Sequence, residues 1–288
     1  MIDSGFVDLS LRSQFDLLNL NRSNYYYQKV APNQSDQDLA NKIYELWLKY
    51  PFFGYRKITA FLNNANESGE IRVNHKKVQR IMKQMNLSAI CPKAKGNYKK
   101  VSYSLIYPYL LKDLKIEKIN QVWTTDITYI RMDEASGGGF TYFLAIIDLY
   151  SRFILASYLS TNMEADFCVD TLQLTLSKYT KPEIFNTDQG SQFTSNGWCD
   201  LLKASKIKIS MDGKGRCFDN IFSERLWRTV KYEEVFLKSY DSVKSAREQL
   251  GAFVEFYNYQ RPHQSLKYNT PADIYFGIKQ LKNKTKLN

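Results

Sequence analysis

Three acidic residues lie in sequence settings that suit a metal-binding active site: Asp126, Asp188 and Glu224. Asp126 lies in the middle of segment 122–130, whose threonine, isoleucine and tyrosine residues are typical of a β-strand. Asp188 follows a short apolar run, and Glu224 lies in an amphipathic helical pattern with 35 residues between it and Asp188. Carboxylates that a fold brings together can hold divalent metal ions, and such ions act on phosphates. We therefore expect one metal site built from three distant segments.

The metal that this ligand set favours is Mg²⁺, which prefers oxygen ligands and keeps water or substrate phosphates in its remaining positions. Three carboxylates can hold two Mg²⁺ ions that share one aspartate, and Mn²⁺ can take their place. Two such ions can activate an attacking oxygen and stabilise a leaving oxygen in an in-line displacement. A single aspartate at a strand end is more often a turn former. The prediction therefore depends on the three placements together and on a basic neighbouring region.

The charge of the chain indicates a polyanionic partner. The 288 residues carry a net charge of +11, and residues 71–100 contain nine lysines and arginines but no acid. A basic surface of this kind favours nucleic acid, although a solvated basic protein is the plainer alternative. The last eleven residues add four more lysines, which we interpret as a frayed tail.

Composition also excludes several classes of protein. The four cysteines are far apart and form no C-x-x-C pair. The chain has only two histidines, so a zinc site of the usual ligand spacing is disfavoured. No apolar run approaches the roughly 18 to 20 residues that span a membrane. The N-terminus lacks the basic start and apolar stretch of a signal peptide. We expect a cytoplasmic protein with reduced thiols and no membrane partner.

The pattern of helix, strand and loop residues divides the chain into five segments. We expect a helical N-terminal arm or partial helix-turn-helix over 1–34, a helix-turn-helix-like domain over 35–90, a basic linker over 91–119, a catalytic domain over 120–238, and a C-terminal helical extension with a basic tail over 239–288. The linker mixes lysines with tyrosines. It could lie along DNA, with charges for phosphates and rings for bases, or equally pack its tyrosines on a neighbouring domain.

The helix-turn-helix-like segment ends in a basic helix. Asn74 can cap a helix over 75–85, whose core face is apolar and whose other face is basic. A short helix, a turn and a basic helix fit a DNA-reading module with the last helix as the recognition element. The alternative is a solvated lysine face. The candidate DNA contacts of this segment are Arg56, Lys57, Lys76, Lys77, Arg80 and Lys83.

The segment from residue 121 onward predicts an α/β layout with helices on a mixed sheet. Three antiparallel strands are expected over 122–131, 140–147 and 152–159, then a helix capped by Asn162, a strand over 184–186, a helix over 196–205, a strand over 207–211 and a helix over 219–236. Asp188 then leaves the carboxyl end of a strand, where open α/β sheets bind ligands.

The helix over 219–236 places its charged residues away from its apolar stripe. Glu224, Arg228 and Lys231 share the side roughly opposite the apolar residues. A carboxylate with a lysine two turns away suits a metal site beside a phosphate backbone. In this interpretation Glu224 binds metal, and Arg228 and Lys231 contact DNA.

Four motifs together resemble insertion-sequence transposases that have a retroviral-integrase-like core. They are Trp123-Thr-Thr-Asp-Ile-Thr-Tyr129, Ile147-Asp-Leu-Tyr-Ser-Arg152, Thr187-Asp-Gln-Gly-Ser-Gln-Phe193 and Asp219-Asn-Ile-Phe-Ser-Glu224, with Lys231 beyond. The tail from Phe256 to His263 fits as well. The resemblance is closest to the group whose transposase is made from two overlapping reading frames by frameshifting, and this chain resembles the second-frame product.

The resemblance implies an RNase H-like core with a mixed five-stranded sheet, preceded by small all-helical DNA-binding domains. It implies that Asp126, Asp188 and Glu224 bind Mg²⁺ and that Lys231 is a basic position typical of the group. The activity it implies is Mg²⁺-dependent cleavage at the ends of the element, then attack of the freed 3′-hydroxyl on another strand.

The partners that the resemblance implies are double-stranded DNA, namely the terminal inverted repeats and the target, and a first-frame protein. Because two ends must be brought together, we also expect a homo-oligomer on DNA. The alternative function is a catalytically inactive DNA-binding regulator or assembly subunit, which the presence of all three carboxylates disfavours. A tyrosine recombinase would need arginines and histidines around a nucleophilic tyrosine, and the two histidines lie in unrelated contexts.

Overall fold

The structure is a computed structural model that describes residues 2–5, 7–26, 34–65, 72–90, 107–133, 138–212 and 221–278. Two compact units make up the chain, Met1–Leu46 and Trp47–Asn288. In the first unit, α1 (Leu11–Leu17) and α2 (Arg22–Tyr26) form a small helical arm. The Ser10 side chain accepts a hydrogen bond from the Ser13 backbone and so caps α1. Helix α3 (Gln34–Lys49) crosses from the first unit into the second.

Helices α4 (Tyr55–Ala65) and α5 (His75–Gln84) pack against each other in the second unit. The Asn74 side chain accepts a hydrogen bond from the Lys76 backbone, which confirms the predicted cap of α5. The Asn63 amide makes two hydrogen bonds with the Val73 backbone and joins the end of α4 to the start of α5. The predicted short helix and basic helix are therefore both present.

The rest of the second unit is a five-stranded sheet in the order β3-β2-β1-β4-β5. Strands β1, β2 and β3 form an antiparallel meander, whereas β4 lies parallel to β1 and β5 parallel to β4. This mixed sheet confirms the predicted layout. The strands are β1 (Val122–Arg131), β2 (Phe140–Asp148), β3 (Ile154–Ser160), β4 (Ile184–Thr187) and β5 (Lys208–Met211).

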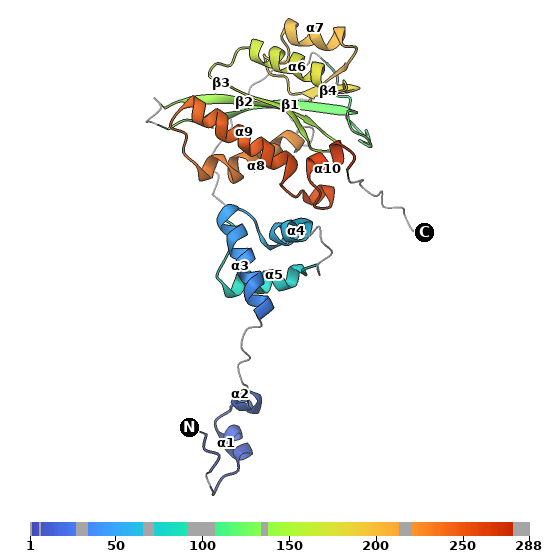
Figure 1. Cartoon of the computed structure of the whole chain (residues 1–288). Helices are drawn as coiled ribbons and strands as arrows, with labels where there is room; N and C mark the ends of the chain where they lie inside the picture. The colour runs from blue at the N-terminus through green and yellow to red at the C-terminus, as the bar shows by residue number, and fades with distance from the viewer. Residues whose placement is uncertain are drawn as a thin grey trace, which may run out of the picture. The chain divides into compact units, whose positions relative to one another are not determined.

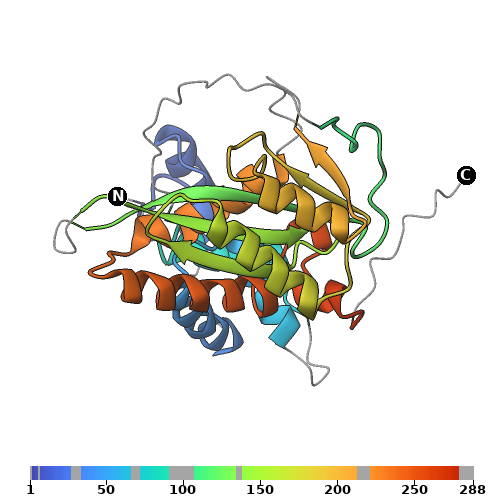
Figure 2. The same ribbon diagram turned by 90° about the horizontal axis from the view of Figure 1, so that it is seen from above.

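Helices cover both faces of this sheet. Helices α6 and α7 lie on one face and α8 and α9 on the other (Figure 1), and Figure 2 shows α6 and α7 running over the strands. These helices, with the short α10, are α6 (Asp166–Lys178), α7 (Asn196–Ala204), α8 (Ile221–Glu233), α9 (Val243–Tyr259) and α10 (Pro271–Tyr275). None of the helices in the described ranges is long and apolar enough to cross a membrane.

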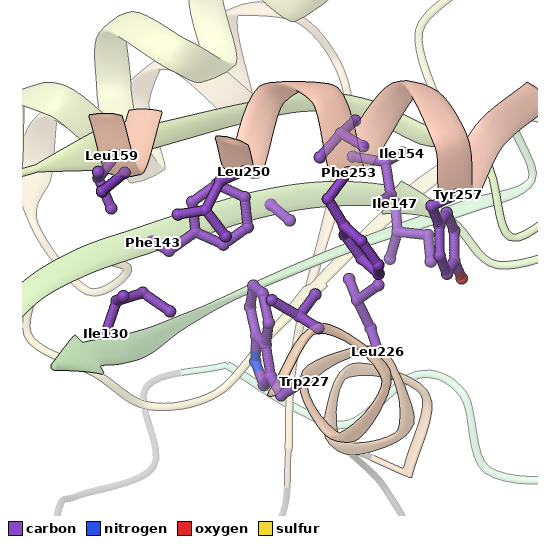
Figure 3. Close-up of a cluster of buried hydrophobic side chains, with 14 of the residues drawn as sticks. Ile130, Phe143, Ile147, Ile154, Leu159, Leu226, Trp227, Leu250, Phe253 and Tyr257 are labelled. Carbon is purple, nitrogen blue, oxygen red and sulfur yellow. The ribbon is translucent and has the colours of Figure 1, made fainter. Parts of the chain in front are cut away.

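The sheet separates two hydrophobic cores because successive side chains of a strand point to opposite faces. Trp123 belongs to the core under α6 and α7, whereas Val122 belongs to the core under α8 and α9. Figure 3 shows the second core, in which Leu226 and Trp227 of α8 and Phe253 of α9 meet the sheet. Helix α9 lies after residue 238, where the predicted catalytic domain ends. Its side chains nevertheless pack in this core.

Two turn residues of the sheet show how side chains set local structure. The buried Asp148 carboxylate accepts hydrogen bonds from the backbone of Ser151 and Asn120, both at 2.8 Å, so it shapes the β2–β3 turn as expected for a turn former. The prediction that Asn162 caps the next helix was wrong. Helix α6 begins at Asp166 after Ala165, and the Asn162 side chain instead accepts a hydrogen bond from the Ser160 hydroxyl.

Candidate active site

The two aspartates predicted to bind metal lie at the same level of adjacent parallel strands. The pairing of β1 with β4 aligns Thr124 with Asn186. Asp126 is two residues beyond Thr124, and Asp188 is two residues beyond Asn186, immediately after β4 ends. The sheet therefore places on neighbouring strands two aspartates that have 61 residues between them in the chain, at the carboxyl end of a strand where α/β sheets bind ligands.

The Asp126 carboxylate is held on the side of the sheet that α8 covers. One oxygen, Oδ1, accepts a hydrogen bond of 2.8 Å from the Ile127 backbone. The other, Oδ2, accepts one of 2.9 Å from the indole Nε1 of Trp227 in α8. Two donors from different elements fix the direction of this half-buried carboxylate, which is how proteins orient metal ligands.

The Asp188 carboxylate is half-buried in a tight turn. Burial raises its pKa above the ordinary value, and a hydrogen bond of 2.9 Å from the Gly190 backbone to Oδ1 opposes that rise. Residue 190 approaches this oxygen so closely that a Cβ atom there would lie 3.0 Å from Asp188 Oδ1, so the turn favours glycine. A buried carboxylate with a raised pKa is stabilised by a nearby cation.

Buried hydrogen bonds connect this turn to the end of β5. The Asn186 amide donates a hydrogen bond of 2.8 Å to Asp212, and the Ser210 hydroxyl donates one of 2.7 Å to Asn186. The Gln189 amide donates to the Asp212 backbone carbonyl at 2.7 Å. These bonds connect the ends of β4 and β5 and fix the backbone on both sides of Asp188. Sequence reasoning assigned no such part to Asn186, because its role depends on which strands are neighbours.

Helix α8 carries the remaining predicted site residues. Glu224 is exposed in the first turn, whereas Lys231 is half-buried. Burial lowers the pKa of Lys231, and the negative charge of Asp126 opposes this, so the lysine lies within electrostatic reach of that aspartate. Trp227 lies between Glu224 and Lys231 at helical spacing. Its donor role was not predicted, although its position three residues after Glu224 was a usable signal.

The oxygen ligands of this site fit a hard divalent cation such as Mg²⁺. Asp126 and Asp188 each lie two residues beyond the paired Thr124 and Asn186, which makes them the candidate pair to share an ion. Within the described ranges no three His, Cys, Asp or Glu side chains are grouped to hold a metal ion, so Asp126, Asp188 and the exposed Glu224 do not form a closed three-carboxylate cluster. Asp126 and Asp188 therefore follow one register on neighbouring strands, Lys231 lies within electrostatic reach of Asp126, and Glu224 is on the same helix as Lys231.

The basic residues predicted to contact DNA fall in different environments. On α5, Lys76, Arg80 and Lys83 are exposed and Lys77 is half-buried. Exposed positions are also found for Arg56, whose Nε donates to the Tyr55 hydroxyl, and for Arg228, whose guanidinium lies 5.7 Å from the Tyr232 ring centroid.

Lys57 forms an ion pair with a distant part of the chain. Its ammonium is 2.7 Å from a carboxylate oxygen of Glu233, at the end of α8, and its side chain is only 27% exposed. The Lys57 charge therefore has a partner within the protein, and the predicted DNA contact at this position stays a prediction.

Comparison with known proteins finds three matching families. Residues 34–95 match an HTH-like domain, and residues 117–217 and 205–271 match two families that are both described as Integrase core domain. The core matches span Asp126, Asp188 and Glu224. Together with the mixed five-stranded sheet, they confirm the expected RNase H-like core preceded by a helix-turn-helix-like region.

Individual relatives cover most of the chain. The chain is 32% identical over 228 residues to the transposase for insertion sequence element IS904 of Lactococcus lactis, covering 77% of this chain and 87% of the relative. It is 28% identical over 258 residues to the putative transposase InsK for insertion sequence element IS150 of Escherichia coli, covering 88% of each. A solved HTLV-2 integrase catalytic core in complex with magnesium superposes with a TM-score of 0.45 at 16% identity, over 55% of this chain and 97% of that one.

Proposed function

The chain belongs to the insertion-sequence transposases, DDE enzymes with an integrase core, and we propose that it cuts the ends of its element and joins the freed 3′-hydroxyls to target DNA. The observation that supports this reaction most directly is the shared level of Asp126 and Asp188 on adjacent parallel strands. Phosphoryl transfer needs positioned charge more than a covalent protein intermediate. Two carboxylates with the half-buried Lys231 near Asp126 would provide such charge.

The proposed metal ligands are Asp126, Asp188 and Glu224, which would hold two Mg²⁺ ions or Mn²⁺ in their place. Bound there, the ions would activate the attacking oxygen and stabilise the leaving oxygen. Trp227 orients the Asp126 carboxylate through its indole N–H. Lys231, beside Asp126, is suited to hold a DNA phosphate at the cut. Glu224 completes the set in the DNA-bound protein.

The proposed partners are double-stranded DNA and other protein subunits. The HTH-like region would bind the terminal inverted repeats, with α5 as the recognition helix and Arg56, Lys76, Arg80 and Lys83 among its contacts. Because two ends must be cut together, we propose a homo-oligomer on DNA, with a first-frame protein as a further partner. An inactive regulator is disfavoured, because each of the three carboxylates is kept.

The experiment that tests the proposed reaction uses the full chain, Mg²⁺ and a labelled duplex that carries the end of the element. We expect a nick at the end of the element, followed by covalent joining of that strand to a second duplex. Binding without a nick in either Mg²⁺ or Mn²⁺, with the first-frame protein also present, would favour the regulator. A covalent protein–DNA adduct would indicate a recombinase instead.

Replacing Trp227 with phenylalanine should weaken divalent-ion binding by roughly 10- to 100-fold, the usual cost of losing a group that orients a metal ligand. The change keeps an aromatic ring in the core but removes the donor to Asp126 Oδ2. Calorimetric titration with Mn²⁺ measures the effect. Trp198→Phe is the control, because that buried indole lies in the other core and makes no side-chain hydrogen bond within the described residues. Equal Mn²⁺ affinity in both variants would refute an orienting role.

Neutralising the exposed face of α5 should weaken DNA binding and lessen its salt dependence. The variant is Lys76→Gln, Arg80→Gln and Lys83→Gln, all at exposed positions. Each lost phosphate contact should lower the slope of log K against log salt by about 0.9. Fluorescence anisotropy at several salt concentrations measures this slope. The matched control changes three exposed lysines elsewhere, Lys178, Lys206 and Lys267. An unchanged slope in the α5 variant would show a merely solvated face.

A further inference from the structure

Glu233, the last residue of α8, binds two cations that come from distant parts of the chain. Arg261 donates to it in a bidentate manner, with Nε 2.6 Å from Oε2 and Nη2 2.7 Å from Oε1. Lys57 of α4 donates to Oε1 at 2.7 Å. Arg261 is only 6% exposed, so this cluster is largely shielded from water. A single carboxylate thus links the helix-turn-helix-like region to the end of the integrase core.

Aromatic packing surrounds the same junction. The Tyr50 ring stacks on Phe256 of α9 with centroids 4.9 Å apart and planes at 18°. Phe52 and Phe53 also contact Phe256, with centroids 6.4 and 6.1 Å away. The Asn64 amide donates a hydrogen bond of 3.0 Å to the Tyr268 carbonyl. Helix α4 and the turn before it are therefore held on the core at three separated points.

Burial and the neighbouring charges shift the pKa values of the groups in this cluster. Burial and the positive charge of Arg261 lower the pKa of Lys57 to about 8, against the pull of Glu233. Burial would raise the pKa of Glu233, but Arg261 and Lys57 more than offset it, so its pKa is lowered. His263, with Nε2 2.9 Å from Arg261 Nη1, has a pKa well below the ordinary value because of burial and the nearby cations. A neutral His263 can accept from Arg261.

This junction bears on the position at which the enzyme cuts. Helix α8 carries Glu224 in its first turn and Glu233 at its end. Nine residues at about 1.5 Å per residue place the two about 13 Å apart along one rigid helix. The element that carries a proposed metal ligand is therefore the element to which α4 is fixed, and α4 packs on the recognition helix α5.

We propose that Glu233 is a positioning residue that fixes the helix-turn-helix-like region on the catalytic core and thereby sets the distance between the bound DNA sequence and the cut. The inference rests on the proposed transposase function. It assigns Lys57 to the junction and not to DNA. It also gives the Arg261-Pro-His263 segment the role of holding Glu233 in place.

Lys57→Met tests this proposal in the full chain, because it removes the link from α4 while leaving the Arg261–Glu233 pair intact. We expect binding of end DNA to stay within about twofold. Nicks at the correct nucleotide should fall about tenfold, with new nicks at neighbouring positions on a sequencing gel. Lys57→Arg should restore a single position, because a guanidinium can reach the same carboxylate. Lys178→Met, at an exposed position of α6, is the control.

Hydrogen exchange of the DNA-free protein tests the junction between α4 and the core independently of DNA cleavage. Amides of α4 should exchange faster in Lys57→Met than in the wild type, whereas those of β1 and β2 should not change. If the wild type exchanges as expected but cuts no DNA, the proposed function fails and the docking stands. Unchanged exchange, an equally sharp cut in Lys57→Met, or a loss of DNA binding as large as the loss of cutting would each overturn the positioning role.

Discussion

Asp188→Asn should reduce end cleavage and strand joining by on the order of 10³-fold or more while DNA binding stays within about twofold. Metal ions contribute several kcal/mol of transition-state stabilisation, and about 1.4 kcal/mol corresponds to a factor of ten. An amide keeps the size of the side chain but loses the charge that holds a divalent cation. Single-turnover cleavage of labelled end DNA in Mg²⁺ measures the effect.

The same substitution should not destabilise the metal-free protein. Burial raises the pKa of Asp188, which means that the folded protein holds this negative charge at a cost. Its removal should leave the melting temperature unchanged or higher. Added Mn²⁺ should raise the melting temperature of the wild type but not that of Asp188→Asn, because a ligand stabilises only the state that binds it.

Asp200→Asn is the matched control, since it changes an exposed aspartate on α7. It should keep both its activity and its response to Mn²⁺. Wild-type cleavage rates in Asp188→Asn would refute the assignment of this residue as a metal ligand. If Asp188→Asn lost both DNA cleavage and a cooperative melting transition, the substitution would instead have unfolded the turn between β4 and Gly190.

The order of strands is the part of the site that local sequence could not supply. Threonine, isoleucine and tyrosine residues identified the strand around Asp126, a short apolar run identified the strand before Asp188, and both strands are present. That these strands are neighbours follows from the crossover through α6, which places β4 beside β1. The shared level of Asp126 and Asp188 is therefore a property of the fold and not of their spacing.

Lys57 shows why charged residues are hard to assign from sequence. A lysine on a basic chain is usually exposed, and the residues next to Lys57 in the sequence do not distinguish it from Arg56. Its partner, Glu233, is 176 positions away in the chain. Helix α9 presents the same difficulty, because a C-terminal helical extension was predicted but not the sheet face on which it packs. Long-range contacts decided both cases.

Glu233→Leu should lower the free energy of unfolding by about 3–5 kcal/mol, because it leaves the buried Arg261 beside Lys57 without a counter-charge. Chemical denaturation at pH 7 measures the change. The pairing lowers the folded-state pKa of Glu233, so its contribution is fully present above the ordinary value of 4.5 and is lost as pH falls through the lowered value. Over that acidic range the wild type and Glu233→Leu should converge in stability.

The cost of this substitution should come from the unpaired cations and not from the loss of a strong attraction. Adding Lys57→Met and Arg261→Met to Glu233→Leu should therefore recover most of the lost stability, since apolar residues often replace a buried ion cluster without penalty. Glu248→Leu, at an exposed position of α9, should change stability by less than about 0.5 kcal/mol. A loss below about 1 kcal/mol in Glu233→Leu would contradict a shielded cluster, because hydrated cations tolerate the absence of a partner.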